Sequence, residues 1–252
     1  MAYGVFAEFY DGLTKNVDYS AKADYLCSIF DKFNHRTGFV LDLACGTGTL
    51  TIELKKRGLD IYGADSSFEM LAEARRKADD ENLEMLFICQ KMQSLDLYGT
   101  INTCVCTLDS INHLTGSEQV QKAFNRVSAF MEKDGLFVFD VNTLYKHRNV
   151  LGNNTFVYDT DSVYCVWQNT FDDKENSILI DLDFFIPENE LYFRCSESFK
   201  EYAYPTDEIE KMLDLSGFDI LGLYHDMTFD KPYDDTQRIT FVAKKRYDVD
   251  EK

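Results

Sequence analysis

The sequence has few of the residues and spacings that interrupt secondary structure, form disulfide frameworks or bind metal ions. Of its 252 residues only 3 are proline, 1 is tryptophan and 4 are histidine, and no two of the 7 cysteines stand in a Cys-x-x-Cys spacing. An odd number of cysteines without that spacing argues against both a disulfide framework and a zinc site. We therefore predict no metal site, and reduced, mostly buried thiols of the kind found in the cytoplasm.

Long apolar runs and positive charge are also scarce. No stretch approaches the roughly 20 apolar residues of a membrane helix, and the first residues lack the basic and apolar regions of a signal peptide. We therefore expect a cytoplasmic protein without a membrane partner. The net charge is −18, and residues 151–252 alone carry 10 bases and 23 acids, a net of −13. This acidity argues against a nucleic-acid partner and favours cationic or amine-bearing small molecules.

Strand-like and helix-like segments alternate through the first 140 residues. Buried strands are expected at residues 39–44, 60–65, 83–89, 101–108 and 135–141. Amphipathic spacing with terminal Ser or Gly residues predicts helices at residues 20–33, 48–58, 66–81 and 117–131. This alternation predicts an α/β protein with a doubly wound, mostly parallel sheet.

The pattern changes after residue 155. Between residues 155 and 200, aromatic and β-branched residues alternate with polar ones, which is typical of antiparallel strands with one solvated face. A helix at residues 205–217 and a closing pair of strands follow. With no repeat or linker at its ends, this antiparallel β segment is predicted to be an insertion into the α/β domain.

A glycine-rich turn follows the first predicted strand, in the sequence VLDLACGTGTL of residues 40–50. Gly46 allows a ligand to approach the backbone, and Gly48 allows the next helix to pack closely, with Thr47 or Thr49 as its cap. Asp42 can order the turn or reach a ligand amine. Asp65, at the end of the second predicted strand, can hold a ribose diol. Together these residues predict a nucleoside ligand.

The motif DLACGTG resembles the first motif of class I S-adenosylmethionine-dependent methyltransferases, with Ala44 in place of their usual first glycine. The segments GADSSFEMLAEARRK, CQKMQSLDL, CTLDSINHL and GLFVFDVNT resemble the family's later motifs. The resemblance implies a Rossmann-like fold with a seven-stranded sheet and S-adenosylmethionine as cofactor. Beyond Asp42, Gly46, Gly48 and Asp65, the cofactor-binding residues that it implies are Ala44, Ser66, Met70, Met92, Gln93, Leu108 and Asp109. The aromatic N-terminal segment is similar to a lid over the cofactor, which makes Tyr10 and Tyr19 lid residues.

The resemblance also implies a division of the chain. Residues 1–145 and 203–252 are predicted to form the cofactor-binding domain, with residues 1–35 as lid and helix, and residues 146–202 to form the insertion that covers the substrate. His113 is a candidate general base and a candidate substrate-binding residue. The other candidates for lining the acceptor pocket are Tyr145, Trp167 and Phe193.

We thus expect in-line methyl transfer to a small-molecule acceptor, with an amine favoured over an RNA. Two alternatives stay open. An NAD-dependent oxidoreductase is disfavoured because residues 46–51 lack the last glycine of G-x-G-x-x-G and the chain has no Tyr-x-x-x-Lys pair. A regulatory protein that binds S-adenosylmethionine without turnover would keep the same pocket.

Overall fold

Two β-sheets organise the structure, a computed structural model that describes residues 6–246. The larger sheet has seven strands in the order β10-β11-β5-β4-β1-β2-β3. Within it β11 is antiparallel to both of its neighbours, while β5, β4, β1, β2 and β3 run parallel. The bounds of its strands are β1 Phe39–Leu43, β2 Asp60–Asp65, β3 Phe87–Cys89, β4 Ile101–Cys106, β5 Met131–Asn142, β10 Phe218–His225 and β11 Arg238–Lys245. The predicted α/β fold with a mostly parallel seven-stranded sheet is confirmed.

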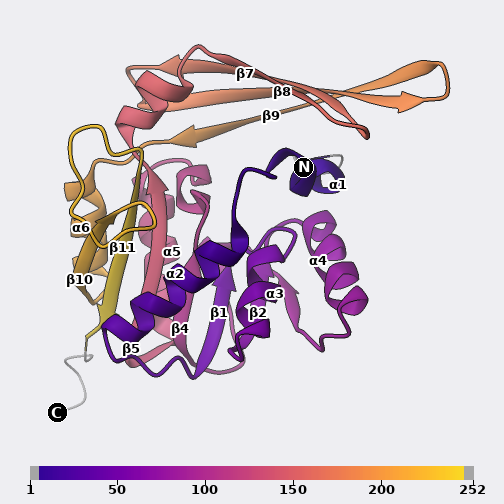
Figure 1. The fold of residues 1–252 in the computed structure, drawn as a ribbon. Helices are drawn as coiled ribbons and strands as arrows, with labels where there is room; N and C mark the ends of the chain where they lie inside the picture. The colour runs from indigo at the N-terminus through magenta and orange to yellow at the C-terminus, as the bar shows by residue number, and fades with distance from the viewer. Residues whose placement is uncertain (1–5, 247–252) are drawn as a thin grey trace.

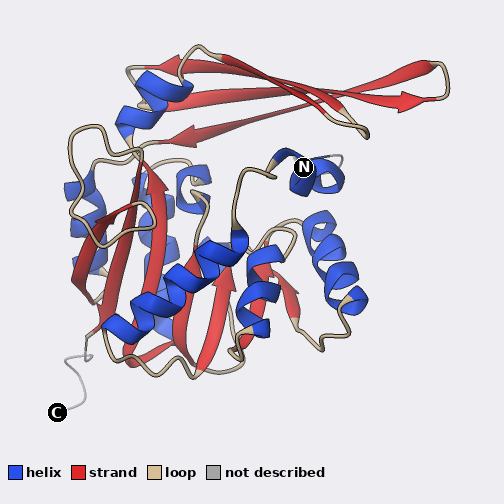
Figure 2. Cartoon of the chain, viewed as in Figure 1, coloured by secondary structure: helices blue, strands red, loops and turns tan. Residues whose placement is uncertain are grey.

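Helices cover both faces of this sheet (Figure 2). The α-helices are α1 Phe6–Leu13, α2 Tyr19–Lys32, α3 Thr49–Lys56, α4 Phe68–Asp80, α5 Ser117–Phe130 and α6 Thr206–Leu215. Short helical turns follow at η1 Met92–Ser94, η2 Ser110–His113 and η3 Lys146–Leu151. Side-chain caps fix two of the starts: Asp18 accepts from the Ala21 N–H of α2, and Ser67 accepts from the Met70 N–H of α4. No helix within residues 6–246 is both long and apolar enough to cross a membrane.

The central strands are buried on both faces, which their continuous apolar sequences predict. On β4, Cys104, Val105 and Cys106 are fully buried. On one face, Phe124 of α5 packs on Phe137 and Phe139 of β5, with ring centroids 5.7 and 5.2 Å away. These aromatic contacts pack α5 onto one face of the sheet.

The second sheet has four antiparallel strands in the order β6-β7-β8-β9. Their bounds are β6 Thr155–Asp159, β7 Tyr164–Asp172, β8 Ser177–Glu188 and β9 Leu191–Tyr202. Figure 1 shows this sheet above the ends of the parallel strands, with α1 between it and α4. The buried face of the sheet forms one apolar cluster with Phe9 and Leu13 of α1 and Met70 of α4. The second sheet and α1 therefore roof the carboxyl edge of the first sheet.

Local structure differs from the predictions at a few places. Residues 6–13 form a helix, α1, in the segment that is predicted to be a lid and for which no secondary structure was assigned. Strand β3 covers only residues 87–89 of the predicted 83–89, because it is an edge strand that pairs with the last residues of β2 alone. Strand β5 is longer than predicted and begins at Met131, since it also pairs with β4 before Gly135.

Candidate active site

The loop after β1 has the backbone conformation that its glycines predict. Ala44, Gly46 and Gly48 all have left-handed φ angles, of 59°, 53° and 73°. A side chain at Gly46 would meet nothing within 4 Å, so this backbone is open to a ligand. A Cβ at Gly48 would lie 2.8 Å from the Cβ of Ala74, so Gly48 is required for α3 and α4 to pack. The left-handed φ of Ala44 explains why glycine is the usual residue at this position in the methyltransferases that the motif resembles.

Asp65 closes this loop onto the end of β2. Its Oδ2 accepts a hydrogen bond from the Gly46 N–H at 2.9 Å, and its Oδ1 accepts one from the Ser67 N–H at 2.8 Å. Burial raises the pKa of Asp65, and these N–H donors oppose the rise. The contact brings together Gly46 and Asp65, which are 19 residues apart in the chain.

Asp42 lies beneath the same loop and is buried. Its Oδ2 accepts a hydrogen bond of 2.6 Å from the Thr51 hydroxyl. Burial raises the pKa of Asp42 to about 7, and the neighbouring Asp65 adds to the rise. Asp42 therefore titrates near neutral pH and responds to any positive charge placed beside it.

The turn after β4 forms the opposite wall. Leu108 and Asp109 both have left-handed φ angles, of 58° and 55°, and both donate their N–H groups to Asp140 of β5, at 3.1 and 2.8 Å. Asp140 in turn pairs with Lys22 of α2 at 3.3 Å and with Arg238 of β11 at 2.5 Å. Burial opposes the ionisation of Asp140, but these cations and N–H donors outweigh it and hold its pKa well below the usual range.

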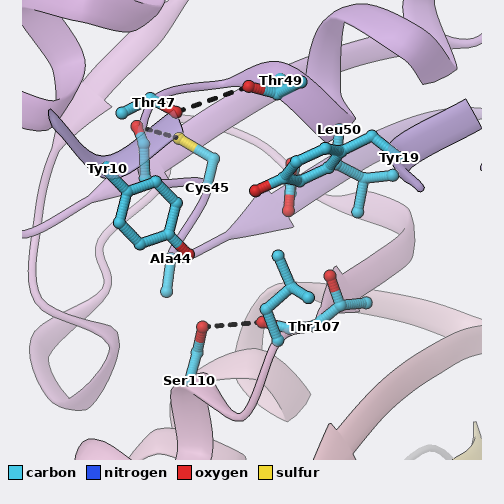
Figure 3. Close-up of a pocket in the computed structure, with 12 residues that line it drawn as sticks. Tyr10, Tyr19, Ala44, Cys45, Thr47, Thr49, Leu50, Thr107 and Ser110 are labelled. Atoms are coloured by element: carbon cyan, nitrogen blue, oxygen red, sulfur yellow. Dashed lines mark hydrogen bonds between the residues drawn. The ribbon is translucent and has the colours of Figure 1, made fainter. Parts of the chain in front are cut away.

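Helix α1 is clasped to the loop by charged and polar contacts. Asp11 accepts from the Thr47 hydroxyl at 2.7 Å and pairs with Lys77 of α4 at 2.5 Å. These contacts engage Thr47, and α3 has no side-chain cap, so the predicted capping by Thr47 or Thr49 is wrong. Figure 3 shows the rings of Tyr10 and Tyr19 beside the loop, where they line a cavity of about 40 Å³ together with Asp42.

A larger cavity of about 500 Å³ runs from this loop to the second sheet. The sequence-predicted residues that line it are Tyr10, Ala44, Gly46, Asp65, Ser66, Met70, Met92, Leu108, Asp109, His113 and Trp167. The polar lining residues that sequence reasoning missed are Asn142, Lys146, Glu201, Gln237 and Arg238.

Four predicted site residues do not line either cavity. Gly48 faces α4 instead, and Gln93 follows Met92 in a tight helical turn, whose successive side chains point in different directions. Tyr145 precedes η3, which contributes its neighbour Lys146 to the lining. Phe193 is 56% exposed near the free end of the β8–β9 hairpin, which projects beyond the rest of the molecule (Figure 1).

Known proteins match both the sequence and this arrangement. A family model described as a methyltransferase domain matches residues 40–135. YqeM of Bacillus subtilis (strain 168), which bears a methyltransferase name, is 31% identical over 97% of this chain and 98% of its own length. An S-adenosylmethionine-dependent methyltransferase from Clostridium acetobutylicum ATCC 824 has a solved structure that superposes with a TM-score of 0.87, at 35% identity, and covers 97% of this chain and 99% of that one.

The chain belongs to the class I S-adenosylmethionine-dependent methyltransferases. The predicted family, enzyme class and cofactor are thereby confirmed, and they disfavour the NAD-dependent alternative. A more distant relative of this methyltransferase is the dTDP-3-amino-3,6-dideoxy-alpha-D-glucopyranose N,N-dimethyltransferase of Streptomyces fradiae. It is 30% identical over 54% of this chain and 53% of its own length.

Replacing Asp140 by asparagine should destabilise the methyltransferase by about 3–5 kcal/mol, because Arg238 and Lys22 lose a buried partner. Asp140 has a lower pKa in the folded chain than in the unfolded chain, so its contribution is complete above the unfolded value and fades as pH falls toward the folded one. Urea unfolding at pH 7 and at pH 3 should therefore show a larger difference between the variant and the wild type at pH 7. Asp134→Asn is the control, since Asp134 is exposed and its ion pairs with Lys133 and Lys244 lie at the surface. Equal effects of the two variants would contradict the role of Asp140.

Replacing Lys77 by methionine should loosen α1. The variant removes the cation that joins Asp11, Thr47 and Thr49, so the amides of residues 6–13 should exchange hydrogen for deuterium several-fold faster, as monitored by mass spectrometry. Lys56→Met is the matched control, because Lys56 pairs with Glu81 on the surface. Unchanged exchange in α1 of the Lys77 variant would refute the role of Lys77 in holding α1 to the loop.

Proposed function

We propose that this methyltransferase transfers a methyl group from S-adenosylmethionine to the amine nitrogen of a small molecule held in the 500 Å³ cavity. One observation carries the proposal: a single cavity is lined both by most of the predicted cofactor residues and by aromatic and charged side chains beneath the second sheet. Its volume is that of a site for a small ligand, which supports a metabolite over a macromolecule.

The cofactor end suits a cationic nucleoside without phosphate. S-adenosylmethionine supplies a methyl group on a positively charged sulfur and also carries an ammonium group. Asp42, Asp65 and Asp109 place carboxylates around this end, and a phosphate would be repelled by them. In our proposal Asp65 faces the ribose, Asp42 and the open backbone at Gly46 face the amino-acid portion, and Met92 faces the adenine.

The acceptor end of the cavity combines apolar aromatic side chains with polar and charged ones. Phe156, Tyr158 and Trp167 of the second sheet line the cavity together with Phe199. The indole N–H of Trp167 donates to Asn169 at 2.6 Å, which holds the ring in place. Aromatic faces bind the carbon skeleton of an acceptor and also favour a cationic amine. The N,N-dimethyltransferase of an amino sugar among the relatives supports an amine as acceptor.

Methyl transfer depends on the alignment of the acceptor with the methyl group more than on a strong general acid or base. The cationic sulfur already activates the methyl group, so the chain must hold the acceptor nitrogen in line with it and keep water away. The turn at Leu108–Asp109 and the clasped α1 supply rigid walls on two sides. His113, which also lines the cavity, is proposed as an acceptor-binding residue.

Methyl transfer should be detectable in a filtered cell extract that contains metabolites but no protein or nucleic acid. With S-adenosylmethionine labelled in its methyl group, we expect the label in a compound of low mass, attached to nitrogen, as identified by mass spectrometry. Asp65→Ala is the control and should weaken S-adenosylhomocysteine binding by about 1–3 kcal/mol through lost hydrogen bonds. Label on oxygen or carbon would contradict the amine, and binding without any transfer would favour a regulatory protein.

Binding of S-adenosylhomocysteine should depend on pH through Asp42. The protein alone protonates this carboxyl below about pH 7, whereas the ammonium group of the ligand favours the carboxylate. Calorimetry should therefore show about tenfold tighter binding at pH 8 than at pH 6, with proton release near pH 6. Asp42→Asn should lose most of this dependence. An unchanged dependence in the variant would assign the titration to Asp65, whose pKa is also raised by burial.

A further inference from the structure

We infer that Glu201, at the end of β9, binds the acceptor's amine nitrogen beside the methyl group to be transferred, an inference that rests on the proposed function. Glu201 lines the 500 Å³ cavity, yet its side chain is only 6% exposed. A carboxylate with that little contact with water requires hydrogen-bond donors or cations. What surrounds Glu201 therefore decides what it binds.

The contacts of Glu201 within the described structure are long. His113 Nε2 lies 3.7 Å from Oε1, His147 Nε2 lies 3.4 Å from Oε2, and Asn142 Nδ2 lies 3.5 Å from Oε2. Good hydrogen bonds to a carboxylate are shorter, at about 2.7–2.9 Å. The carboxylate thus keeps acceptor capacity toward the cavity. Lys146, which also lines the cavity, donates to Asn142 Oδ1 at 2.9 Å, so the amide of Asn142 stands between this cation and Glu201.

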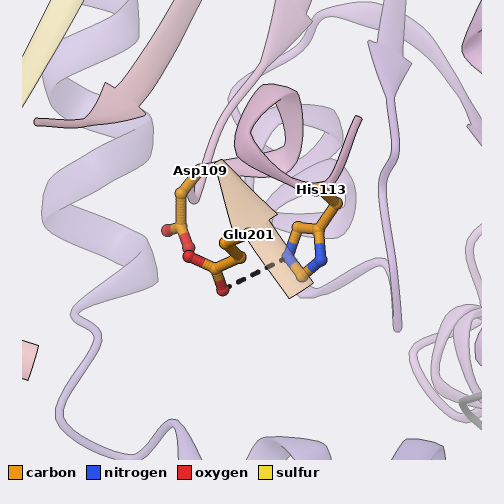
Figure 4. A group of neighbouring side chains, drawn as sticks. All are labelled: Asp109, His113 and Glu201. Atoms are coloured by element: carbon orange, nitrogen blue, oxygen red, sulfur yellow. Dashed lines mark ion pairs between the residues drawn. The ribbon is translucent and has the colours of Figure 1, made fainter. Parts of the chain in front are cut away.

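The geometry places a small polar space beside Glu201. Ligand atoms of Asp109, His113 and Glu201 all lie within 4.8 Å of one another, and Figure 4 shows the three side chains grouped together. Asp109 follows Leu108 in the chain, and both are predicted cofactor residues that line the cavity. His113 is backed by the ring of Phe199 at 5.3 Å. A nitrogen in this space would lie between the cofactor end and the aromatic acceptor end.

An amine fits this space better than a metal ion does. Asp109 Oδ1 already accepts a hydrogen bond of 2.6 Å from Arg238, and Arg238 and Lys146 line the same region. A divalent ion would compete with this guanidinium for Asp109 and be repelled by both cations. An amine needs only hydrogen-bond acceptors, which Glu201 supplies. Because the nitrogen of an amine is tetrahedral, an N–H can point to Glu201 while the lone pair faces the methyl group. During transfer that lone pair forms the N–C bond, the S–C bonding pair returns to sulfur, and one N–H proton passes to the Glu201 carboxylate.

Sinefungin tests this inference without a known acceptor. It is a cofactor analogue in which a carbon bearing a primary amine replaces the sulfonium and its methyl group, so its ammonium lies next to the proposed nitrogen position. By calorimetry, the wild-type protein should bind sinefungin at least tenfold more tightly than S-adenosylhomocysteine. Glu201→Gln should lose this preference while its affinity for S-adenosylhomocysteine changes less than twofold. Glu175→Gln, in the turn between β7 and β8, exposed and paired with Lys200, should keep the preference.

The outcomes separate the two proposals. If S-adenosylhomocysteine fails to bind the wild-type protein, the proposed function fails. If it binds, but the wild type shows no preference for sinefungin or Glu201→Gln keeps that preference, only the role of Glu201 is overturned. Loss of the preference after treatment with EDTA would assign the space to a metal and also overturn it. Should Glu201→Gln not fold, Glu201→Asp, which retains the charge but withdraws it by one methylene, should reduce the preference, and full retention would refute the inference.

Discussion

The carboxylate of Asp140 is the constraint on which the active site depends. It is buried in β5, yet it joins α2 through Lys22, β11 through Arg238 and the β4 turn through two backbone N–H groups. Left-handed backbone at two successive residues with side chains is costly, and the buried acceptor offsets that cost. Arg238 continues the chain of charges to Asp109. The wall that faces both cofactor and acceptor is therefore fixed from inside the sheet and not from the solvent.

The roof over this wall is held by different forces. The second sheet and α1 meet through apolar side chains, whereas α1 meets the glycine loop through Asp11, Lys77 and two threonine hydroxyls. Apolar burial is strong but not directional, while charged hydrogen bonds fix orientation. Helix α1 is thus free to adjust under the second sheet only as far as its polar clasp allows. This combination borders a cavity without filling it.

How much of this site was predictable follows from sequence distance. Gly46 and Asp65 follow neighbouring parallel strands, whose carboxyl ends must meet at one edge, so their spacing alone predicts their proximity. Glu201 and Arg238 come from β9 and β11, and no local pattern states that either returns to that edge. Alternation in β9 identifies a strand but not which end of the hairpin lies over the cavity, which is why Phe193 was misplaced and Glu201 was missed. The helical form of residues 6–13 depends on packing under the second sheet, which the local sequence does not reveal.

The residues proposed for the cofactor and those proposed for the acceptor also come from different parts of the sequence. Cofactor contacts are proposed for residues between Tyr10 and Asp109, most of them on the strand ends, loops and helices of the parallel sheet. Acceptor contacts are proposed largely for residues between His113 and Glu201, many of them on the second sheet. Side chains on one face of that sheet can change without disturbing the hydrogen bonds of its ladder or the Asp140 network. A change of acceptor therefore requires new aromatic side chains on the second sheet, whereas Glu201 of the same sheet and His113, which face the transferred methyl group in our proposal, are constrained by the nitrogen that every amine acceptor shares.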